Sequence, residues 1–492
     1  MSKAQQTPVQ TQYFPLVGGL DAESAQLTLK PGSVIGASNY ESSALDGYQR
    51  IGGFERFDGR PRPSDATYLL MQSATGFTGV AVGNTVNGQT SGATAKVIAL
   101  RGTNQIVVTK ANTWAYGENV RVGTTVVGVY TEDGSDITGV DENDFLTLAA
   151  ADYRADIGAV PGIGRIRGLA VLGDTVYAWR VTAGVGGLSI YKSSGSGWTL
   201  VPLYRELAFT AGSGTAPAEG STVSVGAASA TVKRVVIESG SWGAGTAAGR
   251  LIVTTPGTEF AAGAFTAGIT ATCSGASAAI TLTTSATIKF VVYNFTGAAS
   301  GQRLYGADGV NRGFEFDGDV LVPINTGMAT DSPSFVTAHR NHLFFSFDGS
   351  IQHSAIGNPY SWSAVLGAGE ITAGDTVTGF QVLPSGSDGG SLMIFTANRT
   401  WVLYGSSSAD WRFVNFADNV GAQSGSMQNM GRVVVFDTLG IATVEASQNF
   451  GNFTRLAMSA RIQKILTSRT TLSSVVNRAS ARMRLFFTQG DG

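Results

Sequence analysis

Apolar residues recur in short runs along most of the chain. From Gly162 onward, runs rich in Val, Ile, Phe and Tyr return roughly every 8–12 residues, separated by Gly, Asp, Asn and Ser. That spacing is typical of a sandwich, a barrel or a propeller. Four strands within about 40 residues match one propeller blade. The first such set of strands is expected at 166–172, 175–181, 188–192 and 198–203.

The same rhythm returns along the rest of the chain. Further strands are expected at 288–295, 302–307, 312–316 and 320–324; at 334–339, 342–347 and 351–354, with closure near Trp362; at 378–383, 392–396, 400–404 and 411–416; and at 432–436 and 441–445. A blade cannot bury both of its faces alone, so the pattern predicts blades stacked around an axis. The predicted fold class is all-β, a β-propeller with two inserted small β modules and very little helix. The best helix candidate covers 460–468, where Ile462, Ile465 and Leu466 share a face.

Two segments break the blade rhythm and resemble each other. The first contains GNTV at 83–86, GATAKV at 92–97, IVVT at 106–109, Trp114 and Gly117; the second contains GSTV at 220–223, GAASATV at 226–232, LIVT at 251–254, Phe260 and Gly263. The shared order predicts two copies of one β module. Such insertions usually project outward and carry contacts to partners. The predicted organisation is an N-terminal arm with the start of the propeller (1–72), module 1 (73–152), one blade (153–207), module 2 (208–284) and the remaining blades (285–492).

A Phe-Asp-Gly motif occurs at 57–59, 316–318 and 347–349. Asp-Gly supplies the positive φ angles that a tight hairpin needs, and the preceding Phe can pack on the sheet. A Ca²⁺ loop is disfavoured, because further carboxylates at the required spacing are missing. The motif therefore predicts hairpin turns.

Composition adds a constraint on the surface. Charged residues make up 14% of the chain, against about 25% in average soluble proteins, while 43% are hydrophobic and 65 are Gly. So few charges favour a surface that neighbours in an assembly cover. The net charge of −2 gives no basic footprint for sequence-specific nucleic-acid binding, although DNA could still slide through a channel.

Targeting and redox signals are weak. Cys273 is the single cysteine and cannot form an intrachain disulfide. Residues 1–12 lack the apolar core of a signal peptide, and no apolar run approaches the roughly 18 residues of a membrane helix. We therefore expect synthesis and folding in a cytoplasm.

Basic residues gather near the C-terminal end, where Asp491 is the lone acid after Glu445. They could face a nucleic-acid channel or an acidic neighbour, but a solvated face with ordinary ion pairs is favoured. The strand at 485–487 runs into a turn without a return strand, which predicts that the natural product is longer and that its remainder finishes this blade. The basic residues are Arg455, Arg461, Lys464, Arg469, Arg478, Arg482 and Arg484.

Candidate chemistry is sparse. His339 and His342 have HxxH spacing, but on one strand this interval places them on opposite faces, and no Glu accompanies them. Neither they, His353 nor Cys273 forms a recognisable catalytic motif. The aspartates Asp174, Asp317, Asp348 and Asp375 sit beside Gly or in turns, where a structural role suffices. We assign no catalytic, cofactor-binding or metal-binding residues and predict that the chain is not an enzyme.

Three stretches carry a family resemblance. They are YFPLVGGL at 13–20 with LKPG at 29–32 and GYQRIGGFERFDG at 47–59; GVNRGFEFDG at 309–318; and IQHSAIGNPYSW at 351–362 with FTANRT at 395–400. In these motifs the chain resembles the tail nozzle (tail hub) proteins of short-tailed bacteriophages. Together with the blades, the resemblance covers about 1–72, 155–205 and 285–492, and the two inserted modules lie outside it.

This resemblance implies a structural role in the virion tail. It implies a homo-oligomeric ring, typically a hexamer, below the portal and adaptor rings, with a channel that retains packaged double-stranded DNA and conducts it to the host. Tail fibres or spikes would dock outside, and no catalytic residue or cofactor is implied. The alternatives are another virion decoration or tail adhesion protein, or a carbohydrate-binding or carbohydrate-cleaving propeller.

Overall fold

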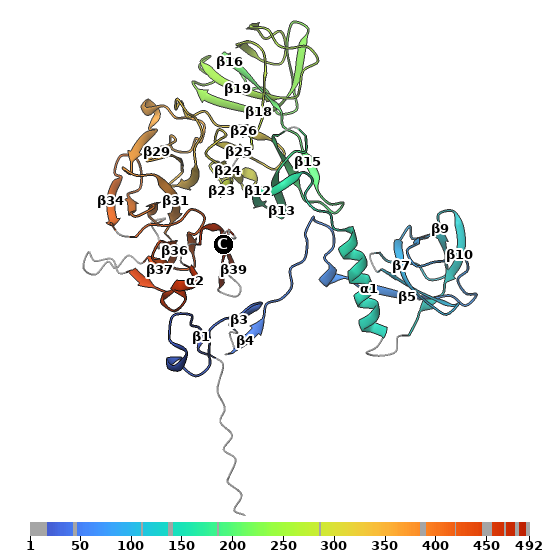
Figure 1. Ribbon diagram of the computed structural model, residues 1–492. Coiled ribbons are helices and arrows are strands. Elements are labelled where there is room, and N and C mark those ends of the chain that lie inside the picture. The colour runs from blue at the N-terminus through green and yellow to red at the C-terminus, as the bar shows by residue number, and fades with distance from the viewer. Residues whose placement is uncertain are drawn as a thin grey trace, which may run out of the picture. The chain divides into compact units, whose positions relative to one another are not determined.

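The chain is mostly β-structure, with 45% of the described residues in strands and 8% in helices. The computed structural model describes residues 17–42, 47–109, 112–135, 141–184, 186–284, 287–383, 390–418, 420–444, 455–466, 469–477 and 482–488. It forms two compact units (Figure 1). One unit combines residues 1–52, 186–188 and 202–492, and the other combines 53–185 and 189–201. The all-β class predicted from the sequence is therefore confirmed.

The larger unit contains four consecutive four-stranded antiparallel sheets, each with its strands in sequence order. Most of these strands fall where the sequence predicts them. In the second sheet, however, the last strand is β30 and not the segment near Trp362, which instead stacks on Phe345 at 5.4 Å between ring centroids. The strands are β23 (Lys289–Tyr293), β24 (Arg303–Ala307), β25 (Phe314–Phe316) and β26 (Leu321–Pro323); β27 (Phe335–His339), β28 (His342–Phe347), β29 (Ser350–His353) and β30 (Gly369–Thr372); β31 (Val377–Val382), β32 (Leu392–Thr396), β33 (Thr400–Tyr404) and β34 (Arg412–Ala417); and β35 (Gln428–Asn429), β36 (Val433–Asp437), β37 (Gly440–Val444) and β38 (Arg455–Ala457).

Neighbouring sheets of this series share apolar cores. On β28, Phe345 packs with Tyr305 of the preceding sheet, while Phe344 packs with Leu392 of the following one. On β32 the alternation continues: Leu392 and Ile394 belong to that same core, and Met393 and Phe395 pack with Val433 and Val435 of the fourth sheet. Because successive strand residues point to opposite faces, the two middle sheets are buried on both sides.

The two ends of the larger unit meet. The hairpin of β39 (Thr471–Asn477) and β40 (Arg482–Phe487) follows the fourth sheet, and Phe487 packs edge-on against Phe436 at 5.4 Å. The short helices η5 (Ala460–Ile462) and α2 (Gln463–Leu466) confirm the predicted helix candidate over these residues. Near the N-terminus lie the parallel pair β1 (Gly19–Leu20) and β2 (Ser33–Val34), the turn η1 (Gln26–Thr28), and the hairpin of β3 (Tyr40–Ser42) and β4 (Tyr48–Arg50).

Module 2 forms a separate sheet within the larger unit. Its strands are arranged in the order β17-β18-β19-β16-β21-β20, with β22 also paired to β16. Its core contains Phe209 and Trp242, which stack at 5.2 Å, and the fully buried Cys273. The strands are β16 (Arg205–Ser213), β17 (Thr222–Val225), β18 (Ala228–Ser239), β19 (Ala247–Val253), β20 (Gly263–Ala264), β21 (Thr270–Cys273) and β22 (Ala278–Ala279).

The smaller unit contains module 1 and one further four-stranded sheet. In module 1 the strands are arranged in the order β10-β9-β6-β7-β8-β5-β11. These are β5 (Tyr68–Gln72), β6 (Thr85–Gly88), β7 (Thr94–Arg101), β8 (Gln105–Thr109), β9 (Glu118–Val122), β10 (Thr125–Tyr130) and β11 (Glu132–Asp133). The further sheet consists of β12 (Ile163–Leu172), β13 (Thr175–Val181), β14 (Leu188–Lys192) and β15 (Thr199–Val201).

The sequence analysis missed the longest helix, α1 (Asp141–Asp156). Three acids, Asp141, Glu142 and Asp144, occupy its first turn, where they favour the helix dipole. Phe145 and Ala149 are spaced by four residues and pack on Leu70, Ile98 and Val107 of module 1. The acidic residues of the first turn are typical of a helix start, but the sequence analysis places most of this segment in a β module.

Equivalent positions of the two modules make equivalent hydrogen bonds. The Gly83 amide donates to the Val97 carbonyl (2.8 Å), as the Gly220 amide does to the Val232 carbonyl (2.7 Å). The Lys96 amide donates to Thr109 Oγ1 (3.1 Å), and the Thr231 amide donates to Thr254 Oγ1 (3.0 Å). The two similar sequences therefore adopt the same local structure.

The Phe-Asp-Gly motifs differ from one another. Asp348-Gly349 makes the predicted two-residue hairpin turn between β28 and β29, with φ of 51° at Asp348. Phe316 begins a longer loop to β26, in which Gly318 has φ of 109°. The hairpin prediction for 57–59 is wrong: no strand flanks this motif, and Asp58 is instead a fully buried acceptor for the main chain.

Candidate functional site

The three histidines gather around Phe344 in the larger unit, at 5.7–6.5 Å between ring centroids. His342 and His353 lie 4.9 and 4.6 Å from the Trp411 ring, between centroids, and 5.3 Å from each other. His339 and His342 pair directly across the β27–β28 hairpin. The prediction that they lie on opposite faces of one strand is therefore wrong, because a turn at Arg340-Asn341, with positive φ at both residues, separates them.

The surroundings of the histidines favour neutral rings. Burial lowers the pKa of His339 to about 4, assisted by the charge of Arg340. Burial also lowers the pKa of His342 and His353, partly offset by hydrogen bonds to the Ser354 carbonyl. The described residues contain no group of three or more His, Cys, Asp or Glu side chains placed to hold a metal ion. We interpret this cluster as part of the packing between sheets.

The turn aspartates mainly serve the backbone. Asp317 Oδ1 accepts from the amides of Asp319 (2.8 Å) and Val320 (2.7 Å). Asp375 accepts from the Thr376 amide at 2.7 Å. In the smaller unit, Asp58 accepts from the Gly158 amide (2.8 Å) and pairs with Arg60 (3.0 Å). These contacts give Asp317, Asp375 and Asp58 structural roles in their turns.

A network of ion pairs joins module 2 to the sheet β23–β26, and we name it the base network. Arg250 on β19 contacts Glu206, Glu238 (2.9 Å) and the Pro323 carbonyl (2.8 Å). Arg312 binds the other oxygen of Glu206 and donates to Asn325 at 2.6 Å. A second branch centres on Arg234, which contacts Glu315 (2.7 Å), Asp317 and Glu219 (2.8 Å).

The base network is largely out of solvent. The side chains of Arg250 and Glu206 are only 7% and 10% exposed, and burial lowers the pKa of Arg250 to about 10. Charges withdrawn from water are costly unless they are paired, so removing one partner leaves an uncompensated charge. The network therefore fixes module 2 on its sheet. Sequence reasoning missed it, because nothing in the strand pattern shows which charged positions meet.

Some of the basic residues near the C-terminal end form ion pairs or hydrogen bonds with N-terminal residues 17–50. We name this N-terminal segment the arm. Glu41 accepts from Arg482 and from Arg484 (3.3 Å), and Arg461 donates to the Gly18 carbonyl (3.3 Å). The Ala22 amide donates to the Arg461 carbonyl at 2.8 Å. Arg482 and Arg484 thus form ion pairs with an acidic residue of the same chain. Arg478, Asp491 and the predicted unfinished end at 489–492 lie outside the described residues, as does the Arg455 side chain.

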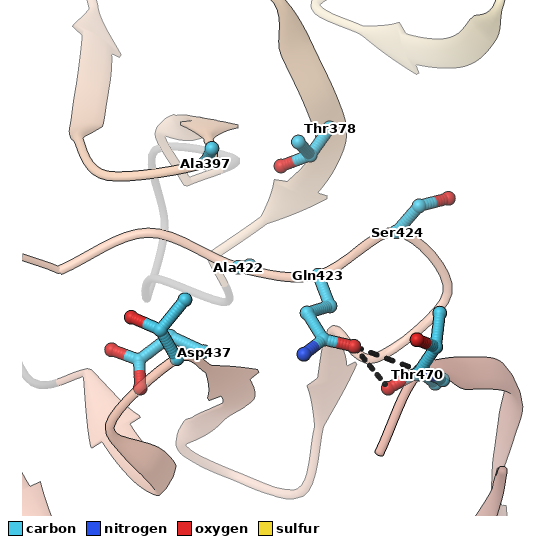
Figure 2. Close-up of a pocket in the computed structure, with 9 residues that line it drawn as sticks. Thr378, Ala397, Ala422, Gln423, Ser424, Asp437 and Thr470 are labelled. Atoms are coloured by element: carbon cyan, nitrogen blue, oxygen red, sulfur yellow. Dashed lines mark hydrogen bonds between the residues drawn. The ribbon is translucent and has the colours of Figure 1, made fainter. Parts of the chain in front are cut away.

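A small pocket of about 280 Å³ lies beside the third and fourth sheets (Figure 2). Gln423 reaches across it, accepting from the amide (3.0 Å) and hydroxyl (3.3 Å) of Thr471. Asp437 is the single ionisable residue in its lining, so the pocket offers no acid–base pair. The pocket is lined by Thr378, Ala397, Ala422, Gln423, Ser424, Asp437, Thr438, Thr470 and Thr471.

Comparison with known proteins gives little. No protein-family model matches the chain, and no curated protein sequence is similar to it. Among solved structures, PorZ, a bacterial surface component of the type-IX secretion system of Porphyromonas gingivalis, is 12% identical, with a TM-score of 0.29 over 67% of this chain and 46% of that one. A functionally unknown protein from Desulfotomaculum acetoxidans is 12% identical, with a TM-score of 0.26 over 59% of this chain and 89% of that one. The computationally designed Ika8 protein is 10% identical, with a TM-score of 0.26 over 67% and 99%. At such scores these similarities support no inference.

Proposed function

We propose that this chain is a structural subunit of the tail nozzle of a short-tailed bacteriophage, built on a β-propeller and working as a ring of identical copies. Its neighbours would be the adaptor ring and the tail fibres or spikes. Double-stranded DNA would pass through the ring without sequence recognition. In this proposal the chain is not an enzyme and needs no cofactor.

The observation that carries the proposal is the series of four meander sheets in the larger unit. Each sheet packs on the next, and the middle two are buried on both faces. Sheets that are buried on both faces are stable when they are stacked around a central axis, as the blades of a propeller are. The sheet β12–β15 of the smaller unit has the same meander strand order.

The motifs that resemble the phage family lie in turns and at contacts between sheets. In GVNRGFEFDG, the Asn311 side chain binds Asp308 (2.7 Å) and both the amide and hydroxyl of Thr283 (2.8 Å each). In IQHSAIGNPYSW, Trp362 stacks on Phe345 and donates to the Pro359 carbonyl at 3.0 Å. These residues hold turns and sheet contacts, which supports a structural role.

The surface suits burial by sister copies. Large apolar side chains remain exposed on several segments, among them Leu27 (101%), Val365 (93%) and Phe54 (79%). Such groups supply interface area in an assembly. Within the part of the chain that the structure describes, no helix has the length and apolarity required to cross a membrane.

Electron microscopy of the purified full chain, alone and mixed with the adaptor ring of the same phage, tests the proposal. We expect closed rings, and six copies per virion tail by quantitative mass spectrometry of purified particles. Monomers that persist at micromolar concentration in the presence of the adaptor ring would refute it. A copy number matching capsid symmetry would instead favour a decoration protein.

A further inference from the structure

Module 1 carries a polar groove of about 530 Å³ at the C-terminal end of α1. α1 lies beside the module sheet (Figure 1), and Phe145 and Ala149 pack on one face of that sheet. Its size lies within the range of roughly 300–1,000 Å³ typical of small-molecule sites. The groove belongs entirely to the smaller unit. It is lined by Arg60, Pro61, Thr85, Thr94, Ala95, Lys96, Thr109, Asp152, Tyr153, Asp156 and Gly195.

One wall of the groove is a row of side chains across three strands. Thr85 on β6 pairs with Lys96 on β7, and the Lys96 amide donates to Thr109 Oγ1 on β8. Lys96 then reaches Asp152 on α1, whose side chain is only 10% exposed. The row thus ties the helix to the sheet, while the exposed Thr85 side chain stays at the opening.

The opposite wall is the last turn of α1. Asp152 and Asp156 are four residues apart and share one face of the helix. Carboxylates are disfavoured at this end by the helix dipole. Lys96 pairs with Asp152, and the charge of Asp156 also acts on Lys96. Within the described residues, the Asp156 carboxylate and the Tyr153 hydroxyl have no hydrogen-bond partner. The Tyr153 ring packs partly on the core that contains Phe145 and also lines the groove.

The lining of the groove carries two positive and two negative side chains, and this balance restricts the charge of a ligand that fits. Arg60 is already held by Asp58 (3.0 Å) and the Ser196 carbonyl (2.7 Å), and Lys96 by Asp152. An anionic ligand would meet Asp152 and Asp156, and a cationic ligand would meet Lys96 and Arg60. A neutral polyhydroxylated ligand can donate to Asp156, accept from a threonine hydroxyl and lay a C–H face on the tyrosine ring.

We propose that this groove binds a neutral saccharide, as an activity additional to the assembly role and independent of it. The ligand donates a hydroxyl to the Asp156 carboxylate and exchanges hydrogen bonds with Thr85, while Tyr153 supplies the apolar surface. Module 2 lacks this groove wall: its equivalent row is Thr222, Thr231 and Thr254, without the lysine that holds the helix in module 1.

The test is saturation-transfer NMR and calorimetry on the full chain with linear tetrasaccharides of glucose, galactose, mannose and N-acetylglucosamine. We expect at least one to bind with Kd of about 1 mM or tighter. Asp156→Ala should weaken binding about 10-fold or more, because a hydrogen bond to a charged group is lost. Thr85→Val should weaken it several-fold.

The matched control is Thr222→Val, the equivalent change in module 2, which should leave binding unchanged. Both test positions are exposed, so their circular dichroism and melting profiles should equal those of the native chain. Absence of binding by all four sugars at roughly 10 mM overturns the proposal. So does binding that survives both Asp156→Ala and Thr85→Val. Ring formation is scored separately, so its failure leaves this test readable.

Discussion

At the scale of single residues, His339 is the clearest titration probe. Its ring is 3% exposed and its pKa is lowered to about 4 by burial, whereas an unfolded histidine titrates near 6.5. Between these values the unfolded state binds more protons than the folded state, so stability falls as the pH drops from about 6.5 to 4. Well above pH 6.5 this residue contributes no pH dependence.

We therefore predict that the larger unit loses about 1.5 kcal/mol of stability between pH 6.5 and pH 5 through His339 alone. Most carboxylates stay ionised in this window, which isolates the histidine effect. His339→Leu should reduce the pH dependence by this amount, while His342 and His353 keep their own contributions, as measured by urea unfolding with Trp fluorescence at both pH values. An unchanged slope in the variant would contradict the assignment of a neutral, buried ring.

The repeated modules offer a second prediction at this scale. Thr109→Val and Thr254→Val each remove the hydroxyl that accepts from an equivalent strand amide. Each change should speed exchange of that amide, at Lys96 or Thr231, by about 10-fold, because the lost hydrogen bond contributes about 1–1.5 kcal/mol. Thr125→Val, at an exposed strand start, serves as the control. Opposite responses in the two modules would contradict their equivalence.

At the scale of elements, the strand pattern was largely readable from sequence. Runs of apolar residues between Gly and Asp gave most strands of the four sheets. In the two middle sheets these runs are nearly continuous, because both faces are buried. Contacts between side chains of different elements could not be predicted from the sequence. His339 and His342 pair because a tight two-residue turn joins the ends of their two strands, and Arg250 meets Glu206 across paired strands. For the candidate groove, sequence analysis identified module 1 but missed α1, which forms one wall.

The base network predicts how module 2 is fixed. Arg250→Met leaves Glu206 and Glu238 with Arg312 as their remaining cation in a poorly solvated site, so it should cost about 3–5 kcal/mol. Amide exchange of β16 and β19 should rise, and cleavage should appear near residues 202–205. The control is Arg62→Met, which breaks an exposed pair with Asp65 (2.9 Å) and should cost less than about 1 kcal/mol. If both variants behave alike, the network is not what holds the module.

At the scale of the whole molecule, the arm contact joins segments far apart in sequence. Glu41 and Arg482 are separated by 441 residues, so their contact closes the larger unit end to end. The Glu41 pKa is lowered, first by the hydrogen bond from Gln49 and then by Arg482 and Arg484. The folded protein therefore favours the ionised carboxylate. This contact contributes its full stability above the ordinary pKa of about 4.5 and loses it as the pH falls below that value.

Charge reversal tests this closure directly. Glu41→Arg should open the arm, speed tryptic cleavage at Lys30, and raise amide exchange in β39–β40 while β27–β30 stays protected, because only the terminal hairpin loses a contact. Adding Arg482→Glu and Arg484→Glu should restore resistance, since the pairs re-form with opposite sign. These pairs are partly exposed, so roughly 0.5 M salt should loosen the native arm in the same direction. Glu55→Arg, an exposed reversal in the other unit, controls for the new charge. Equal cleavage at Lys30 in the native chain and in Glu41→Arg would show that the ion pairs do not hold the ends together.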